Sequence, residues 1–222
     1  MTRIPTPQLG RRHILGGLAA SAAASALPQL PALASPRLVP TPQQTLGPFY
    51  PVEWVGDIDN DLVVVRGEAA QAMGQITHVA GRILDIDGNP ISGAAVEIWQ
   101  CDNNGHYLHP GDRAARGKRD QRFQGRGKML SGPDGSYSFR TIKPVPYPGR
   151  TPHIHFAISA PGKPRLVTQM YVSGEPLNER DGLLRSIRDI RQREMVLVRL
   201  EAADRLETGA ALAGTFDIVM PA

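Results

Sequence analysis

Two histidines separated by a single residue lie in residues 146–156, which read PYPGRTPHIHF. Successive side chains of a β-strand point to opposite faces, so a strand here would place His153 and His155 on one face and Ile154 and Phe156 on the other. Imidazole is the commonest metal ligand among side chains, and two on one face can bind one ion. The spacing predicts a metal-binding pair backed by a core, although the histidines alone also fit an exposed polar strand face.

A tyrosine approaches this pair from a stiff segment. Tyr147 stands between Pro146 and Pro148, whose rings fix φ and hold the segment extended. Pro152 directly precedes the histidines and suits the first residue of a strand, where its missing N–H matters least. We therefore expect the phenol of Tyr147 to return toward the two imidazoles.

A second phenol stands in residues 100–110, QCDNNGHYLHP, just after a predicted strand that contains Trp99. Tyr107 lies there at the edge of a glycine-rich loop. Together with Tyr147, His153 and His155 it gives two phenols and two imidazoles. Phenolate is a hard, strongly donating anion, so this set favours Fe(III) over softer or less charged ions.

Short β-strands are predicted to position these residues. Alternating or apolar segments separated by Gly and Pro turns begin at His78, with a strand on each side of the turn at residues 87–90. A long loop spans 102–130, and one short helix is expected in GLLRSIRDIRQRE, residues 182–194. Seven or eight strands predict an all-β fold, an antiparallel β-sandwich with long loops and at most one or two short helices.

The chain divides into three parts by composition. Residues 1–34 contain the twin arginine Arg11-Arg12, an alanine-rich apolar stretch and an Ala-Leu-Ala before residue 35, which predicts a twin-arginine export signal and a periplasmic or secreted protein. The stretch is too interrupted for a transmembrane anchor, so no stable membrane anchor is expected. Residues 35–75 are expected to form an arm packed on the domain, and 76–222 the β-sandwich catalytic domain.

Charge and cysteine content exclude two other classes of function. Outside the first 34 residues, 22 basic residues stand against 21 acidic ones, so nucleic acid is not an expected partner. Cys101 is the one cysteine; it cannot form an internal disulfide, and a single cysteine is more often a small buried hydrophobe than a nucleophile.

The sequence resembles the intradiol ring-cleavage dioxygenases, of the protocatechuate 3,4-dioxygenase type. The resemblance runs from TPQQTLGPFYP to VTQMYVSGEP, and its marks include GRILDIDGNPI, VEIWQ, GHYLH, DGSYSFRTIKP, PYP, RTPHIHF and TQMY. It implies a β-sandwich with one non-haem Fe(III) per chain. By position, Tyr107 and His155 resemble the family's equatorial ligands, and Tyr147 and His153 its axial pair.

The resemblance also implies a reaction of aromatic catabolism. A catechol would bind the iron through both oxygens, with Tyr147 released as a base, and O2 would then open the ring between the two hydroxyls to a muconate-type diacid. Arg150 matches an arginine that faces the substrate and would stabilise charge on the ring. Gln169 in TQMY matches a glutamine beside the reacting carbons.

Two departures from the family pattern concern the pocket and assembly. The family usually has a longer, tryptophan-containing segment between the second tyrosine and the histidines, whereas PGRT, with Gly149, is all that stands here. A more open pocket is expected, and the substituents of the catechol stay open. The helical N-terminal dimerisation region of catechol 1,2-dioxygenases is absent, and the oligomeric state, a homo-oligomer included, also stays open.

Two alternatives remain at this point. GRILDIDGNPISGAAVEIW also fits transthyretin-like or carboxypeptidase-regulatory sandwich modules, which bind carbohydrate or protein without catalysis and have no use for two tyrosines and two histidines. The seven basic residues between 113 and 128 fit either a solvated surface loop or a positive field that attracts anionic aromatics.

Overall fold

The computed structural model describes residues 37–203, 205–207 and 209–222. The predicted export signal, residues 1–34, lies outside the described residues. No helix within the described ranges is both long and apolar enough to cross a bilayer.

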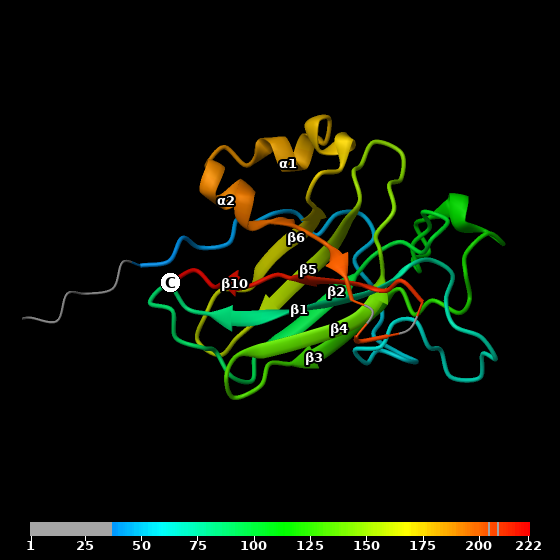
Figure 1. Ribbon diagram of the computed structural model, residues 1–222, viewed down its shortest axis with the longest axis horizontal. Coiled ribbons are helices and arrows are strands. Elements are labelled where there is room, and N and C mark those ends of the chain that lie inside the picture. The colour runs from blue at the N-terminus through cyan, green and yellow to red at the C-terminus, as the bar shows by residue number, and fades with distance from the viewer. Residues whose placement is uncertain (1–36, 204, 208) are drawn as a thin grey trace, which may run out of the picture. The chain divides into compact units, whose positions relative to one another are not determined.

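Two five-stranded sheets form the fold (Figure 1). In the first sheet the order is β10-β1-β9-β8, and β4 also pairs with β1, antiparallel, outside this order. Its strands are β1 (Ile76–Leu84), β4 (Ser136–Ile142), β8 (Glu201–Ala202), β9 (Leu212–Thr215) and β10 (Ile218–Val219).

The second sheet has the order β3-β2-β5-β6-β7 and carries the predicted histidine strand near its centre. Its strands are β2 (Ala95–Trp99), β3 (Arg126–Leu130), β5 (His153–Ser159), β6 (Leu166–Val172) and β7 (Leu197–Val198). The register places His155 of β5 between Trp99 of β2 and Gln169 of β6. A predicted ligand therefore has a neighbour on each flanking strand.

The β-sandwich prediction is confirmed, but the pairing is mixed rather than purely antiparallel. β1 pairs in parallel with β9 and β10, and β6 pairs in parallel with β7. A parallel pair needs a long crossover between its strands. The segment between β6 and β7 supplies one, because it contains both α-helices.

The predicted single helix is two helices, α1 (Gly182–Ser186) and α2 (Ile190–Met195), which Figure 1 places beside β6. The side chain of Asp181 caps α1 and that of Asp189 caps α2. Because Asp189 favours an N-cap over a helix interior, it starts a second helix after Ile187 ends the first. Two short 3-10 turns, Arg113–Ala115 and Pro176–Glu179, complete the helical elements in the described ranges.

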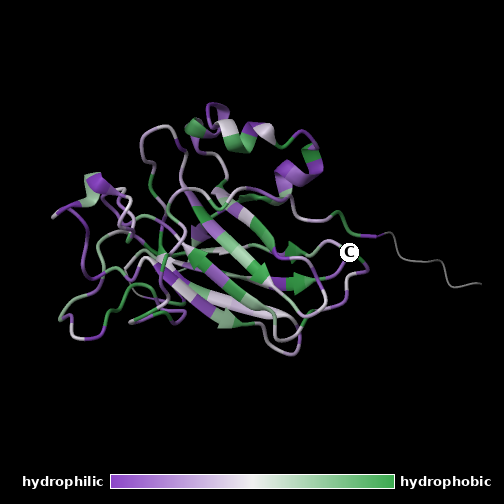
Figure 2. Ribbon diagram, turned by 180° about the vertical axis from the view of Figure 1, so that it is seen from behind, coloured by the Kyte–Doolittle hydropathy of each residue, from purple (hydrophilic) through white to green (hydrophobic). Residues whose placement is uncertain are grey.

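The core lies between the two sheets, where the apolar faces of their strands meet (Figure 2). Val79 and Phe139 from one sheet and Ile154, Phe156 and Ile158 from the other are at most 1% exposed. The opposite face of β5, which carries the histidines, is buried as well. Loops and the segment before β1 cover it.

That segment before β1 is hydrogen-bonded along the sandwich. The backbone N–H groups of Thr41 and Gln44 donate to the carbonyl oxygens of Val219 (3.0 Å) and Val167 (2.7 Å). Further along, Leu62 and Val63 are fully buried in the core. Residues 42–50 are thereby held close to the ends of β5 and β6, next to the predicted ligands.

Candidate metal centre

The two predicted histidine ligands converge on one point. Their Nε2 atoms are 3.2 Å apart, and both side chains are buried, with His153 1% and His155 2% exposed. Nδ1 of His153 lies 2.7 Å from the carbonyl oxygen of Thr151, which can only accept a proton. Nδ1 of His153 therefore carries the hydrogen, and its Nε2 carries the lone pair. The indole of Trp99 stacks on His155 at 4.7 Å and fixes the ring plane.

Both imidazoles are neutral near pH 7. Burial lowers the pKa of His153 to about 4, and the positive charge of Arg150 adds to the effect. Burial also holds the pKa of His155 well below its ordinary value. Neutral imidazole is the form that binds metals, so the two rings are ready to act as ligands.

The two predicted tyrosines close the cluster from the opposite side. The rings of Tyr107 and Tyr147 meet edge to face at 5.5 Å; Tyr107 lies 6.1 Å from His155, and Tyr147 lies 5.5 Å from His153. The hydroxyl of Tyr107 is buried and has no hydrogen-bond partner among the described residues. The structure thus brings all four predicted ligands together.

This donor set fits a metal cation with phenolate ligands. Burial raises the pKa of both phenols, Tyr107 the more strongly, so without a nearby cation they stay protonated. An unpartnered buried hydroxyl is costly in a folded protein, and a bound cation would both deprotonate it and satisfy it. No group of three or more His, Cys, Asp or Glu side chains within the described ranges is suited to a metal, so a metal held here by more than the two histidines would need the tyrosines.

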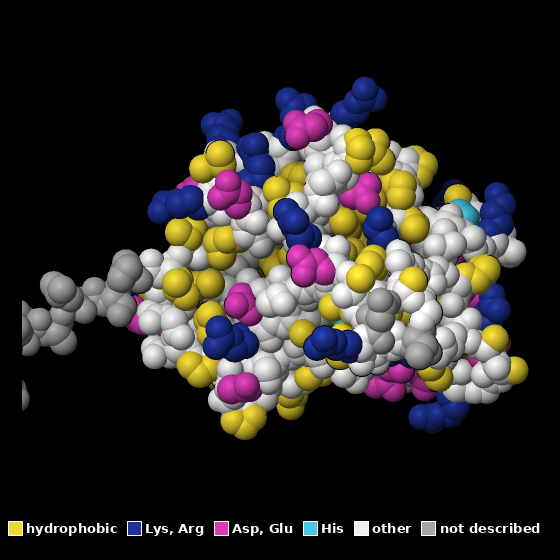
Figure 3. Space-filling view, in the orientation of Figure 1, with side chains coloured by type: hydrophobic (Ala, Val, Ile, Leu, Met, Phe, Trp, Pro, Cys, Tyr) yellow, Lys and Arg dark blue, Asp and Glu magenta, His cyan; other side chains and the backbone are white. Residues whose placement is uncertain are grey.

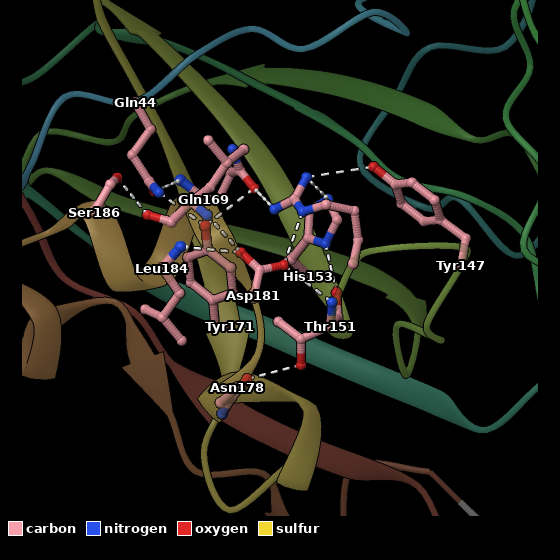
Figure 4. Close-up of polar contacts among 12 residues, drawn as sticks. Gln44, Tyr147, Thr151, His153, Gln169, Tyr171, Asn178, Asp181, Leu184 and Ser186 are labelled. Atoms are coloured by element: carbon pink, nitrogen blue, oxygen red, sulfur yellow. Dashed lines mark hydrogen bonds and ion pairs between the residues drawn. The ribbon is translucent and has the colours of Figure 1, made fainter.

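Arg150 lies beside the cluster and makes a contact with each nitrogen of its guanidinium. Nη1 lies 3.4 Å from the Tyr147 hydroxyl and 3.3 Å from Nε2 of His153, and Nη2 donates to Oε1 of Gln169 at 2.6 Å (Figure 4). Nε donates to Asp181 at 2.8 Å. Burial alone would lower the pKa of Arg150, but the hydrogen bond and charge of Asp181 outweigh it and raise the pKa.

Asp181 is a site residue that the sequence analysis missed. Its side chain is fully buried and accepts four hydrogen bonds, two from the backbone N–H groups of Leu183 and Leu184 and two from Arg150 and Thr151. Burial would raise its pKa, but these donors lower it overall, so Asp181 is ionised near pH 7. One carboxylate therefore caps α1 and fixes the arginine at the same time.

The Gln169 side chain is fully buried; within the described residues its amide oxygen is hydrogen-bonded and its amide nitrogen is not. Its Oε1 accepts from Arg150 and from the hydroxyl of Tyr171 (3.2 Å), whereas its Nε2 has no partner among the described residues. Gln44 supports this pair, because its Nε2 donates to the Tyr171 hydroxyl and its Oε1 accepts from the backbone of Gln169. The amide N–H of Gln169 is thus a buried donor with no partner among the described residues.

Two residues of the segment before β1 contact the cluster and were also missed. A Cβ atom on Gly47, whose φ is +72°, would lie 3.3 Å from Cε1 of His155, so the backbone passes directly over that ring. Phe49 stacks on Tyr107 with ring centres 4.7 Å apart and meets Tyr147 edge-on at 6.5 Å. The Gly-Pro-Phe-Tyr sequence at 47–50 was the available signal.

The short segment between the second tyrosine and the histidines forms a tight turn. The N–H of Arg150 donates to the carbonyl of Tyr147 at 2.9 Å, and Gly149 takes φ +83°, a conformation that glycine adopts readily. Beyond its two chain neighbours, no described residue has an atom within 4 Å of the position of a Cβ on Gly149. Gly149 itself therefore places no side chain beside the cluster.

Comparison with known proteins gives a consistent result. A family model described as Dioxygenase matches residues 46–222. The protocatechuate 3,4-dioxygenase beta chain of Burkholderia cepacia is 36% identical over 182 residues, which cover 78% of this chain and 76% of that protein. Hydroxyquinol 1,2-dioxygenase of Nocardioides simplex is 35% identical, and the match covers 64% of this chain but only 51% of that enzyme.

Solved structures agree with these matches. The dioxygenase domain of a carbohydrate-binding fusion protein from Streptomyces sp. SirexAA-E is 33% identical, with a TM-score of 0.63 over 82% of this chain and 99% of that one. An intradiol ring-cleavage dioxygenase from Tetranychus urticae is 25% identical, with a TM-score of 0.64 over 83% and 95%. These matches give no support to a binding module of the transthyretin or carboxypeptidase-regulatory type. The chain belongs to the intradiol ring-cleavage dioxygenase family.

Proposed function

We propose that this protein is a non-haem Fe(III) dioxygenase that opens catechol-type rings between the two hydroxyls. Both atoms of O2 enter the product, a muconate-type diacid. The observation that carries the proposal is the convergence of two neutral imidazoles, one buried phenol and one half-buried phenol beside a fixed guanidinium. Membership in the dioxygenase family supports the same chemistry.

One ion per chain would be held by Tyr107, Tyr147, His153 and His155. When bound, iron supplies a Lewis acid and a template for the ring oxygens. His153 and His155 offer Nε2 atoms in fixed orientations, because the Thr151 carbonyl and the Trp99 ring hold them. Tyr107 is the more enclosed phenol, with 2% of its surface exposed, whereas Tyr147 is only half-buried.

The surrounding side chains have separate roles in this proposal. With a metal bound, Tyr147, the more accessible phenol, would be a phenolate, and its oxygen could accept the proton that a catechol hydroxyl loses. Arg150 cannot lose its charge, and Asp181 fixes its plane, so it stabilises negative charge that develops on the ring. The free N–H of Gln169 lies next to Arg150 and can donate to an oxygen at the reacting carbons.

The tight turn at 147–150 bears on the choice of substrate. Gly149 contributes no side chain on that side, so fewer contacts would enclose a small ring and position catechol itself. The protein should therefore accept substituted or bulky catechols at least as well as catechol. The hydroxyquinol and protocatechuate activities named for its relatives also concern substituted rings.

Residues 1–34 are proposed to direct export by the twin-arginine route. The support is the Arg11-Arg12 pair, the alanine-rich stretch and the Ala-Leu-Ala at 32–34. In a bacterial host with this route, the tagged protein should appear outside the cytoplasm. Replacing both arginines with lysine should retain it inside, and export unaffected by that change would exclude this route.

Product analysis tests the catalytic proposal. The purified iron-loaded protein is incubated with catechol, protocatechuate and a bulky aryl catechol, and the products are separated and identified by mass. Diacids from cleavage between the hydroxyls are expected from each substrate, with kcat/KM for the bulky catechol at least equal to that for catechol. A yellow semialdehyde, formed by cleavage beside the hydroxyls, would contradict the proposal.

A further inference from the structure

The carbonyl oxygen of Thr151 holds the ring of His153, at 2.7 Å from its Nδ1. The peptide group that carries this carbonyl joins Thr151 to Pro152, and proline has no N–H. This peptide group therefore has no donor of its own that could anchor it. Because the partner of a histidine's second nitrogen fixes its tautomer and its orientation, the state of His153 depends on what holds Thr151.

Thr151 is held through its N–H and through its hydroxyl. The N–H donates to Oδ2 of Asp181 at 3.1 Å, and Oγ1 donates to Oδ1 of Asn178 at 2.8 Å (Figure 4). A β-branched side chain has few rotamers, and a residue before proline has a restricted backbone, so a fixed hydroxyl also restrains the carbonyl. The bond to Asn178 therefore limits rotation of the Thr151–Pro152 peptide.

Asn178 is itself fixed, at its backbone and at both ends of its amide. Its Nδ2 donates to the carbonyl of Val172 at 2.9 Å, and its backbone N–H donates to the carbonyl of Glu175 at 3.0 Å. A carbonyl can only accept, so the amide nitrogen faces Val172 and the amide oxygen faces the Thr151 hydroxyl. Asn178 thus joins the end of β6 to the residue two places before β5.

The 3-10 turn Pro176–Glu179 brings both partners to Thr151. It carries Asn178, and the N–H of Asp181 donates to the carbonyl of Leu177 in the same turn at 3.1 Å. Charged side chains lie on the outer side of the helices at the top of the molecule (Figure 3), whereas Thr151 and Asp181 are each 1% exposed. The contacts of Thr151 are therefore made away from bulk water, where a hydrogen bond is stronger.

We propose that Asn178 is a positioning residue for the candidate ligand His153 and acts through the Thr151 hydroxyl. With this bond in place, the Thr151 carbonyl accepts from Nδ1, and the lone pair of Nε2 is left to the ligand cluster. Without it, the Thr151–Pro152 peptide is free to turn, and His153 also takes the tautomer whose Nε2 carries hydrogen and has no lone pair for a metal. The inference rests on the proposed function for the identity of the metal, but its first measurement needs no metal.

Two substitutions of one residue isolate the hydroxyl. Thr151→Val removes it and keeps the size and the branched shape of the side chain, whereas Thr151→Ser keeps the hydroxyl and should behave as the wild type. Asn178→Ala removes the acceptor instead. Thermal unfolding of each variant checks that the fold is retained.

Thr141→Val is the matched control, because β4 contains a bond of the same kind. The hydroxyl of Thr141 donates to Oε1 of Gln100 at 2.9 Å, and Nε2 of Gln100 donates to the carbonyl of Ile142 at 3.2 Å. Thr141 and Gln100 are fully buried. Its loss should lower the unfolding temperature about as much as Thr151→Val, without an effect on His153.

The first measurement is the ¹⁵N NMR spectrum of the His153 ring in the metal-free full chain near pH 7. The wild type, Thr151→Ser and Thr141→Val should each show one protonated Nδ1 and one unprotonated Nε2. In Thr151→Val and in Asn178→Ala the shifts of the two nitrogens should move toward each other, because the two tautomers exchange. A change in stability alone would not move these shifts.

The second measurement is the loss of iron from the loaded protein to an excess of a hydroxamate chelator. Iron should leave Thr151→Val and Asn178→Ala about tenfold faster than the wild type, the low end of the range for residues that orient a metal ligand. The double variant Thr151→Val/Asn178→Ala should lose iron no faster than either single variant, because all three lack the same bond. Thr141→Val should match the wild type.

Unchanged ring shifts in both Thr151→Val and Asn178→Ala would overturn the proposal. So would iron loss that rises equally in Thr141→Val, a failure of Thr151→Ser to restore the wild-type behaviour, or additive effects in the double variant. A wild-type protein that binds no iron would contradict the proposed function, and the ring shifts of the metal-free protein would then decide this inference alone.

Discussion

Two regions carry the candidate site: the strands β5 and β6 with the turn before β5, here called the strand side, and the segment from the end of β2 to the start of β3, called the loop side. His153, His155 and Gln169 lie on the central strands β5 and β6, and the polar network around Arg150 is tied to a fully buried carboxylate, that of Asp181. Tyr107 and Arg119 lie in the long segment between β2 and β3, and Arg126 is the first residue of β3; neither arginine has an acidic partner within the described ranges.

On this account, one region holds the groups that catalyse the reaction and the other holds groups that select the substrate. Groups that meet a developing charge must already be in place, because reorganising them during the reaction would raise the barrier. Groups that select a substrate can stay unpaired in the free protein, because the bound substrate supplies the opposite charge. On this account, changes on the strand side affect kcat for every catechol, and changes on the loop side affect the choice among catechols.

The largest effect should follow removal of the central cation of the strand side. Arg150→Ala should lower kcat/KM by about 100- to 1,000-fold for all catechols, the range typical of losing a preorganised electrostatic group. Iron content should not change, because Arg150 is not among the predicted ligands. Steady-state kinetics together with metal analysis check this. A loss of kcat/KM restricted to carboxylated substrates would contradict the proposed difference between the strand side and the loop side.

A smaller effect on the same side should follow Asp181→Asn. The amide would place an N–H donor against Arg150 and Thr151, or against Leu183 and Leu184, where the carboxylate now accepts. Loss of these bonds should reduce stability by about 1–3 kcal/mol, and a displaced Arg150 should lower kcat by roughly tenfold or more with little change in KM.

Asp189→Asn is the matched control for that change. Asp189 caps α2 through the N–H of Arg191 and, within the described ranges, has no contact with the ligand cluster. Because asparagine is also a good N-cap, this variant should keep both stability and kcat. Equal loss of kcat in the two variants would show that Asp181 acts only through its helix.

The close approach of Gly47 to His155 gives a third, intermediate test. Gly47→Ala and Gly56→Ala impose similar backbone strain, about 1–2 kcal/mol, at φ +72° and +80°. Only the methyl group at 47 would press on the His155 ring, since nothing lies within 4 Å of a Cβ at 56. Thermal unfolding should shift alike in both, while kcat falls several-fold in Gly47→Ala alone. Equal activity of both variants would contradict the placement of this segment.

The smallest effect should come from the exposed charges of the loop. Arg113→Gln or Lys118→Gln should lower kcat/KM for carboxylated catechols by no more than about twofold, and the difference should vanish near 1 M salt, where the screening length is about 3 Å. The neutral carboxamides of these acids should show no change. An exposed charge whose effect persists at high salt would place a contact where the structure has none.

Much of the fold could be predicted from residue patterns. The alternation in residues 153–158 placed the histidines opposite Ile154 and Phe156, and the structure has that arrangement. The parallel pairing of β9 and β10 with β1 was not readable, because it depends on where the chain returns after long connections rather than on local alternation. Two-residue strands such as β7 and β10 carry too little pattern to reveal a direction.

Some residues of the candidate site could likewise be predicted from the sequence, and others could not. The residues predicted for it have side chains with a chemistry of their own, and the structure brings Tyr107, Tyr147, His153 and His155 together. Asp181 was missed because an aspartate before a helix reads as an N-cap, which it also is. Gly47 was missed because a glycine gives no sign of what lies above it, and only the packed structure shows the His155 ring there.

The most direct test of the central claim is the visible absorption spectrum of the natively produced protein, recorded with its metal content. Two phenolates bound to Fe(III) should give a red-brown charge-transfer band with one iron per chain, and the band should weaken in Tyr107→Phe and in Tyr147→Phe. A colourless protein with stoichiometric zinc would contradict the account.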